Sequence, residues 1–174
     1  ALGMANDIPT ILSAAGLLQA ITDIHFLLVG DGKDRAQLET STKAMGLENV
    51  TFTGPQPKSE MPHVLAASDA CLATLMDIPM FKTTYPNKVF DYMAAGRPTV
   101  LGIDGVIREV VEAAGGGICV PPGNPQALAE AVASLHDAPQ QAKAMGASAR
   151  HYVVANFNRN RQANQFIDVV ETLR

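Results

Sequence analysis

The apolar residues of this chain alternate between two spacings, and this alternation limits the possible folds more than any other feature. The run at 25–29 is continuously apolar, as in a strand covered on both faces, whereas 8–21 has apolar residues at steps of three and four, as on one helix face. Short connections between such segments require parallel strands with crossover helices. The pattern predicts an α/β domain with a doubly wound, Rossmann-like parallel sheet flanked by helices.

The predicted elements cover nearly the whole chain, 1–174, as a single domain without repeats or linkers. Strands are expected at 25–29, 50–53, 69–75, 98–103 and 118–120, and helices at 8–21, 33–45, from Ser59, 86–95, 106–114, 125–136, 139–155 and 158–173. Ser59 and Asn124 are the expected N-caps, and Gly46 is the expected C′ residue of its helix. Because the loop 1–6 leads directly into a helix, we expect a first strand to lie upstream, in a larger protein.

Composition excludes several classes of function. The 174 residues include 13 Lys+Arg scattered among 17 Asp+Glu, for a net charge of −4, which disfavours nucleic acid as a partner. The apolar runs are far shorter than the roughly 18 residues of a membrane-spanning helix, and no basic leader is present, so we expect a soluble, cytoplasmic protein. Cys71 and Cys119 are expected to be reduced thiols, and the four histidines lack metal-ligand spacing, so no metal site is expected.

The loops that follow the strands are the places to search for a ligand site in an open α/β sheet. Gly30 and Gly32 do not form a dinucleotide fingerprint because its third glycine would fall at Arg35, which disfavours a nicotinamide enzyme. The most informative stretch is 85–98, YPNKVFDYMAAGRP. Pro86 favours a helix start, so the N–H groups of Asn87 and Lys88 and the Lys88 charge together predict a site for a diphosphate.

Asp91 lies one helical turn after Lys88, with Tyr92 on the same face, at spacings i, i+3 and i+4. A carboxylate at that distance from an anion site is suited to accept both hydroxyls of a ribose. Spacing alone leaves open a second interpretation, in which Lys88 and Asp91 form a surface ion pair without functional importance.

Several sequence blocks in one order give the chain a resemblance to a known family. The blocks are VGDG at 29–32, NVTFTG at 49–54, PNKVFDYMAAGRPTV at 86–100, DG at 104–105 with REVV at 108–111, and GICVPPGNP at 117–125 with LA at 128–129. They resemble the C-terminal, nucleotide-sugar-binding half of GT-B fold glycosyltransferases of group 1, also called family 4. The Pro86–Lys88 arrangement is similar to the branch that builds bacterial surface polysaccharides.

The resemblance implies a set of donor-binding residues. Asp91 takes the place of the glutamate that contacts the donor ribose, while the first glutamate of the family's E-x7-E motif would fall at Thr83, where this sequence departs from the pattern. Gly3 and Asn6 stand where the family usually has basic residues, and Lys88 could compensate for their loss. The loop after Gly54 commonly holds the nucleotide base, which makes Pro55 and Gln56 candidates, although a plain β-to-α turn explains them equally well.

The function that this resemblance implies is that of a donor-binding lobe. Sugar would move from UDP-sugar or GDP-sugar to a saccharide or lipid-linked acceptor held by a separate N-terminal lobe, which could also touch the inner face of the membrane. No metal or other cofactor and no catalytic acid, base or nucleophile are expected in this chain, and the isolated domain is expected to be inactive. The alternatives are one lobe of a nucleotide-sugar 2-epimerase and a non-catalytic nucleotide-binding or assembly module.

Overall fold

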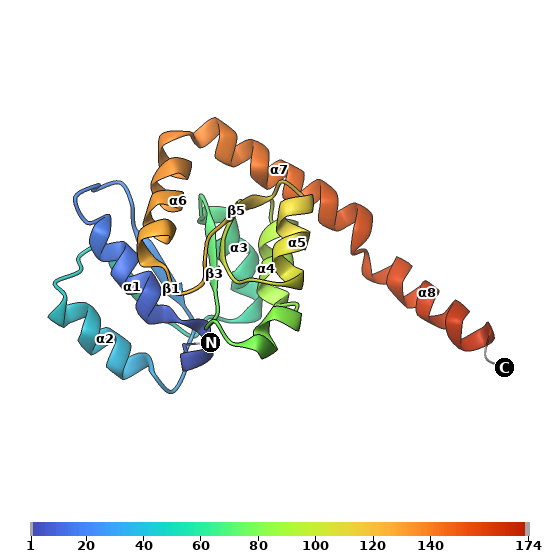
Figure 1. Cartoon of the computed structure of the whole chain (residues 1–174), viewed down its shortest axis with the longest axis horizontal. Helices are drawn as coiled ribbons and strands as arrows, with labels where there is room; N and C mark the ends of the chain where they lie inside the picture. The colour runs from blue at the N-terminus through green and yellow to red at the C-terminus, as the bar shows by residue number, and fades with distance from the viewer. Residues whose placement is uncertain (1, 173–174) are drawn as a thin grey trace.

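The computed structural model describes residues 2–172, apart from the side chains of residues 159 and 160. Ala1 and Leu173, which the sequence analysis assigns to the first loop and to the end of the last helix, lie outside the described residues. Within the described residues, strands and helices follow the predicted order, and Figure 1 shows strands flanked by helices. The α/β class is therefore confirmed.

The observed elements differ from the expected ones mainly at their ends. The strands are β1 (Phe26–Val29), β2 (Val50–Gly54), β3 (Cys71–Thr74), β4 (Thr99–Gly102) and β5 (Gly117–Cys119). The helices are α1 (Ile8–Leu17), α2 (Arg35–Ala44), α3 (Met61–Ala67), α4 (Asn87–Ala94), α5 (Val106–Ala113), α6 (Pro125–Asp137), α7 (Pro139–Asn156) and α8 (Arg159–Thr172). Three short 3-10 turns are η1 (Met4–Asn6), η2 (Lys58–Glu60) and η3 (Pro79–Thr83).

All strand pairs in the described residues are parallel, but they form two sheets instead of the expected single sheet. One sheet pairs β1 with β2, with Phe26 opposite Val50, and the other has the order β3-β4-β5, with Thr99 between Cys71 and Gly117. β1 and β3 each have a partner on one side only. The described strands thus form two parallel sheets, and the predicted arrangement of parallel strands flanked by helices is confirmed.

Apolar side chains fill two cores, one on each side of the strands. Consecutive residues of β4 point to opposite sides, so that Val100 belongs to the core beneath α1 and α6, while Leu101 belongs to the core beneath α4 and α5. Both side chains are fully buried. This is why the strand segments are continuously apolar in the sequence.

Two of the three predicted helix ends are confirmed and one is wrong. Asn124 caps α6 through its side-chain oxygen, which accepts a 3.0 Å hydrogen bond from the amide of Ala127. Gly46 adopts a φ of +65° directly after the C-cap of α2. Ser59 does not cap a helix, because Pro57 opens a 3-10 turn in which the Glu60 amide bonds the Pro57 carbonyl at 2.9 Å.

The last helix extends away from the rest of the molecule (Figure 1). Its apolar residues Phe166, Ile167 and Val170 are all exposed. Among the described residues, no helix combines the length and the apolar character that a bilayer span requires.

Candidate functional site

The carboxyl end of β3 holds the first loop of the chain in place. The Thr74 hydroxyl donates a 2.6 Å hydrogen bond to the Asn6 carbonyl, and the Met76 amide donates to the Ala5 carbonyl at 3.1 Å. Thr74 is buried, so this contact is shielded from water. The loop that contains Gly3 and Asn6 is thereby fixed at the strand end where an α/β sheet binds its ligands.

Lys88 extends from the first turn of α4 to the same strand end. Its Nζ donates to Asn6 Oδ1 at 2.9 Å and lies 3.5 Å from the Thr74 carbonyl oxygen. Burial lowers the pKa of Lys88 from 10.5 to about 8. Within residues 2–172, no carboxylate lies at ion-pair distance from this ammonium group. Its charge is therefore partly desolvated and is balanced only by neutral oxygen atoms.

The N-terminus of α4 adds backbone donors beside this charge. Pro86 is the N-cap residue, and no side chain caps the helix. The first amides of a helix, here those of Asn87 and Lys88, have no acceptor within the helix. Val89 and Met93 are fully buried, and this fixes the orientation of the helix. The structure therefore brings Asn6, Lys88 and the tip of α4 together.

Asp91 lies on the exposed surface of α4, one turn further along the helix. In the described structure it forms no ion pair with Lys88, whose ammonium group turns towards Asn6 instead. The interpretation of these two residues as a surface ion pair is therefore wrong. A contact of Asp91 with ribose stays a prediction.

Three other candidates show no local contact that marks them as functional. A Cβ atom built on Gly3 would meet nothing within 4 Å, so the space around this residue is open. Pro55 and Gln56 are exposed after β2, in the sheet that does not contain β3. Gln56 Nε2 lies 3.4 Å from the Thr53 carbonyl oxygen, which is a contact within its own turn. Their role in binding a base therefore stays a prediction.

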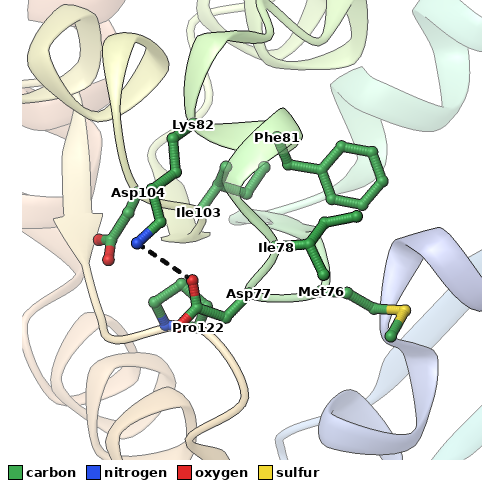
Figure 2. A pocket seen from close by; sticks show the side chains of 8 residues that line it. All are labelled: Met76, Asp77, Ile78, Phe81, Lys82, Ile103, Asp104 and Pro122. Carbon is green, nitrogen blue, oxygen red and sulfur yellow. Dashed lines mark ion pairs between the residues drawn. The ribbon is translucent and has the colours of Figure 1, made fainter.

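A small pocket at the ends of β3, β4 and β5 contains charged residues that the sequence analysis did not select. Figure 2 shows Lys82 directed at Asp77, with 3.3 Å between Nζ and Oδ1, and Asp104 on the neighbouring loop. Asp104 also bonds Arg108 at 2.9 Å. Gly105 permits this packing, because a Cβ atom there would lie 1.9 Å from the Lys82 carbonyl oxygen. Asp77 and Asp104 lie in the loops that follow β3 and β4, and this position in the sequence was the available signal.

Thr83 stands at the position of the first glutamate of the E-x7-E pattern. Its side chain is exposed in η3, and its hydroxyl donates to the Met80 carbonyl at 3.1 Å. No carboxylate is present at this position. The charged residues that line the nearby pocket are Asp77, Lys82 and Asp104 (Figure 2).

Elsewhere in the described residues, the titratable groups do not form a cluster that could hold a metal ion. In the part of the chain that the structure describes, no three His, Cys, Asp or Glu residues lie close enough together to hold a metal ion. Cys71 and Cys119 are free thiols, and burial raises the pKa of Cys71 to about 12 and that of Cys119 to about 11. Both thiols are therefore protonated at neutral pH and poorly suited to nucleophilic chemistry.

Together these features define a class of protein: an α/β domain with a desolvated cation and an uncapped helix N-terminus at the carboxyl ends of parallel strands. Such an arrangement suits the binding of a phosphate-containing ligand. Residues 4–138 match the family model for group 1 glycosyl transferases. The chain belongs to this family.

Relatives of known activity agree with the family. The chain is 29% identical over 146 residues to 2-deoxystreptamine glucosyltransferase of Streptomyces kanamyceticus, covering 83% of this chain and 36% of that protein. It is 27% identical over 161 residues to the lipopolysaccharide core biosynthesis glycosyltransferase LpsD of Rhizobium meliloti, covering 90% and 45%. The chain thus spans less than half the length of these curated relatives.

Solved structures identify the fold. HepE from Anabaena in complex with UDP superimposes with a TM-score of 0.86 at 21% identity, covering 98% of this chain and 46% of that one. Sucrose-phosphate synthase from Thermosynechococcus elongatus gives a TM-score of 0.85 at 24% identity, covering 98% and 43%. The chain therefore has the fold of one half of a GT-B glycosyltransferase, as the resemblance implied.

Proposed function

We propose that this chain is the donor-binding lobe of a glycosyltransferase that takes sugar from UDP-sugar or GDP-sugar. The observation that carries the proposal is the desolvated Lys88 ammonium group, held at the end of β3 beside the tip of α4. A diphosphate supplies the negative charge that this group lacks, and the first amides of α4 supply hydrogen bonds. The structure of HepE with UDP is consistent with this ligand class.

The chemistry follows from charge. When the bond between the anomeric carbon and the β-phosphate oxygen breaks, its electron pair stays on the phosphate, and negative charge grows there. Lys88 and the amides of Asn87 and Lys88 stabilise that charge from fixed positions, which is the most effective form of electrostatic catalysis. No general base is required in this chain. Asp91 would accept hydrogen bonds from the ribose hydroxyls, Pro55 and Gln56 would contact the base, and Gly3 would leave room for the phosphates.

The remaining parts of the reaction belong to other parts of the complete protein. Sugar transfer requires an acceptor, and we propose that a second lobe binds a saccharide or lipid-linked acceptor. In this proposal the protein works in the cytoplasm, with membrane contact only through that lobe. The chain's short coverage of its relatives, 36% and 45%, supports a protein with a further lobe.

Calorimetric titration of this chain with UDP, GDP and their sugar conjugates tests the proposal. Lys88→Ala should weaken the binding of whichever diphosphate is preferred by about 1–3 kcal/mol, the range for a charge-assisted contact. Lys43→Ala, an exposed lysine on α2, is the matched control and should leave binding unchanged. The donor-site proposal fails if none of these nucleotides binds at millimolar concentration. The assignment of Lys88 to the site is wrong if its substitution does not change the affinity.

Charge compensation by Lys88 further implies that binding does not need a divalent metal ion. The same titration in the presence of EDTA should give an unchanged affinity. A loss of binding that Mg²⁺ or Mn²⁺ restores would show that a metal ion neutralises the diphosphate, contrary to the proposal.

A further inference from the structure

The guanidinium group of Arg35 lies against the carboxyl end of β2, where Gly54 leaves room for it. A Cβ atom built on Gly54 would lie 3.0 Å from Arg35 Nη1 and 3.6 Å from both Cζ and Nη2. Three atoms of the planar group therefore lie beside the space of the missing side chain. Because Gly54 also has a φ of +74°, which disfavours any other residue, the backbone conformation itself maintains this space.

Two carboxylates fix the orientation of this guanidinium group. Its Nε donates a 2.7 Å hydrogen bond to Glu39 Oε1, one helical turn further along α2, and its Nη1 lies 3.9 Å from Asp31 Oδ1. The Asp31 carboxylate is in turn held by the amide of Gly32, which donates to Oδ1 at 2.9 Å. Among the described residues, none accepts a hydrogen bond from Nη1 or Nη2 of Arg35. Two neighbouring donor nitrogens are thus held in place without a hydrogen-bond acceptor.

The charges around Arg35 differ from those around Lys88. Arg35 is shared by two carboxylates, and Asp34 directly precedes it, so this corner of the molecule has surplus negative charge. Within residues 2–172, Lys88 has no such carboxylate at ion-pair distance. A phosphate is attracted to Lys88 and repelled by the carboxylates at Arg35. The donors of Arg35 therefore suit an uncharged part of a ligand that presents acceptors.

The first loop of the chain connects the two cations across the strand ends. The Leu2 amide donates to the Asp31 carbonyl at 2.9 Å, after the end of β1, and Asn6 accepts from Lys88 at the end of β3. Adjacent segments of a sheet lie about 4.8 Å apart. With β2, β1, the first loop and β3 in succession, Arg35 and Lys88 are separated by about 10–15 Å. This separation is comparable to the length of a nucleoside diphosphate from its base to its phosphates.

We propose that Arg35 is the residue that selects the base of the donor nucleotide, and that this base is guanine. The inference rests on the proposed function, which places the diphosphate at Lys88 and the base beside Pro55 and Gln56. Guanine presents two acceptors on one edge, O6 and N7, and the paired N–H groups of an arginine match them. Nη1 and Nη2 of Arg35 donate to these two atoms, while Glu39 holds the group through Nε.

Uracil does not offer the same pair of acceptors. Its O4 atom has a ring N–H donor on one side and a C–H group on the other, so it accepts from one nitrogen of Arg35 only. A bidentate contact between arginine and guanine discriminates against the wrong base by about 10- to 100-fold. The donor in this proposal is therefore a GDP-sugar and not a UDP-sugar.

The alternative is an ion pair of Arg35 with Glu39 that only supports α2. Such a partly exposed pair at spacing i, i+4 contributes little to the free energy of unfolding, so a stability measurement does not distinguish the two roles. The base preference of the protein does distinguish them, because a residue that contacts only Glu39 and Asp31 cannot change it.

Calorimetric titration of wild type and Arg35→Met with GDP, inosine diphosphate, 7-deaza-GDP and UDP tests the proposal. Wild type should bind GDP and inosine diphosphate about 10- to 100-fold more tightly than UDP, because both purines present O6 and N7. The 7-deaza analogue lacks the N7 acceptor and should bind more weakly than GDP. Arg35→Met should bind GDP about as weakly as UDP, with little change in the affinity for UDP. Arg150→Met, which replaces an exposed arginine of α7, is the matched control and should retain the preference of wild type.

Several results would overturn the proposal. Wild type that binds UDP as tightly as GDP would show that the site does not select guanine. An equal loss of GDP and UDP affinity in Arg35→Met would place Arg35 at the ribose or the phosphates, and an unchanged GDP affinity would leave it as a surface ion pair. In each of these cases a nucleoside diphosphate still binds, so the proposed function is unaffected. Absence of binding by every nucleotide would overturn both proposals.

Discussion

Replacement of Lys88 by Met should stabilise the protein while removing its charge. The pKa of about 8, against the ordinary 10.5, means that burial disfavours the ammonium form in the folded state. A difference of one unit between the pKa values of the folded and unfolded states corresponds to about 1.4 kcal/mol. The charged Lys88 therefore destabilises the folded state at pH 7 by about 3 kcal/mol. Loss of the 2.9 Å bond to Asn6 offsets about 1 kcal/mol of this. We expect a net gain of about 1–2 kcal/mol.

The sign of the pH dependence follows from the same difference. The destabilisation is fully present below pH 8, where Lys88 is charged in both states, and it fades between pH 8 and 10.5, where only the unfolded chain holds the proton. Wild-type protein should therefore gain about 2 kcal/mol relative to Lys88→Met between pH 7 and pH 9.5. Other titrating groups cancel in this comparison because both proteins contain them.

Urea unfolding at the two pH values measures these differences, with Lys43→Met as the matched control. Lys43 is exposed on α2, so its replacement should change the free energy of unfolding little at either pH. The reasoning is refuted if Lys88→Met is no more stable than wild type at pH 7 and the difference does not change with pH. Such a result would mean that water reaches the Lys88 ammonium group.

Five further substitutions have expected outcomes that thermal or urea unfolding and nucleotide titration can check. Gly105→Ala should lower the free energy of unfolding by several kcal/mol, because its Cβ would collide with the Lys82 carbonyl. Gly123→Ala, also at positive φ but in open space, should lower it by about 1 kcal/mol. Thr99→Val should stabilise the folded protein by about 1 kcal/mol, because the buried Thr99 hydroxyl has no partner among the described residues. Thr74→Val should destabilise it, because the hydrogen bond to the Asn6 carbonyl is lost. Asn6→Asp should stabilise the ligand-free protein but weaken UDP binding, because it neutralises Lys88; equal or tighter binding would contradict the assigned role.

Hydrophobic spacing predicted the order of strands and helices because burial on two faces leaves a direct trace in the sequence. Val100 and Leu101 are adjacent and both fully buried, as expected for a strand between two layers of helices. Helix ends were less predictable, since competing local bonds decide them. Ser59 has the side chain of an N-cap, yet Pro57 two residues earlier starts a 3-10 turn in its place.

The candidate site was predicted in part, for a similar reason. Pro86 predicted a helix start with Lys88 in its first turn, and the structure confirms that start. The partner of Lys88 did not follow, because Asn6 lies 82 positions away and only the folded chain brings the two together. The pocket of Asp77, Lys82 and Asp104 likewise depends on the close approach of η3 to Gly105, which no local pattern encodes.

The partly buried charge of Lys88 is explained better by a role in ligand binding than by a role in folding. A lysine that only stabilised the fold would have a carboxylate partner, and Asp91, one turn away, was available for that role. Instead the ammonium group contacts neutral oxygens at a strand end, where its desolvation destabilises the protein. In the proposed function, a diphosphate at this position would restore the missing charge and raise the Lys88 pKa again. The proposed function would therefore couple ligand binding and folding stability through one side chain, and the nucleotide that binds should raise the unfolding temperature of wild type more than that of Lys88→Met.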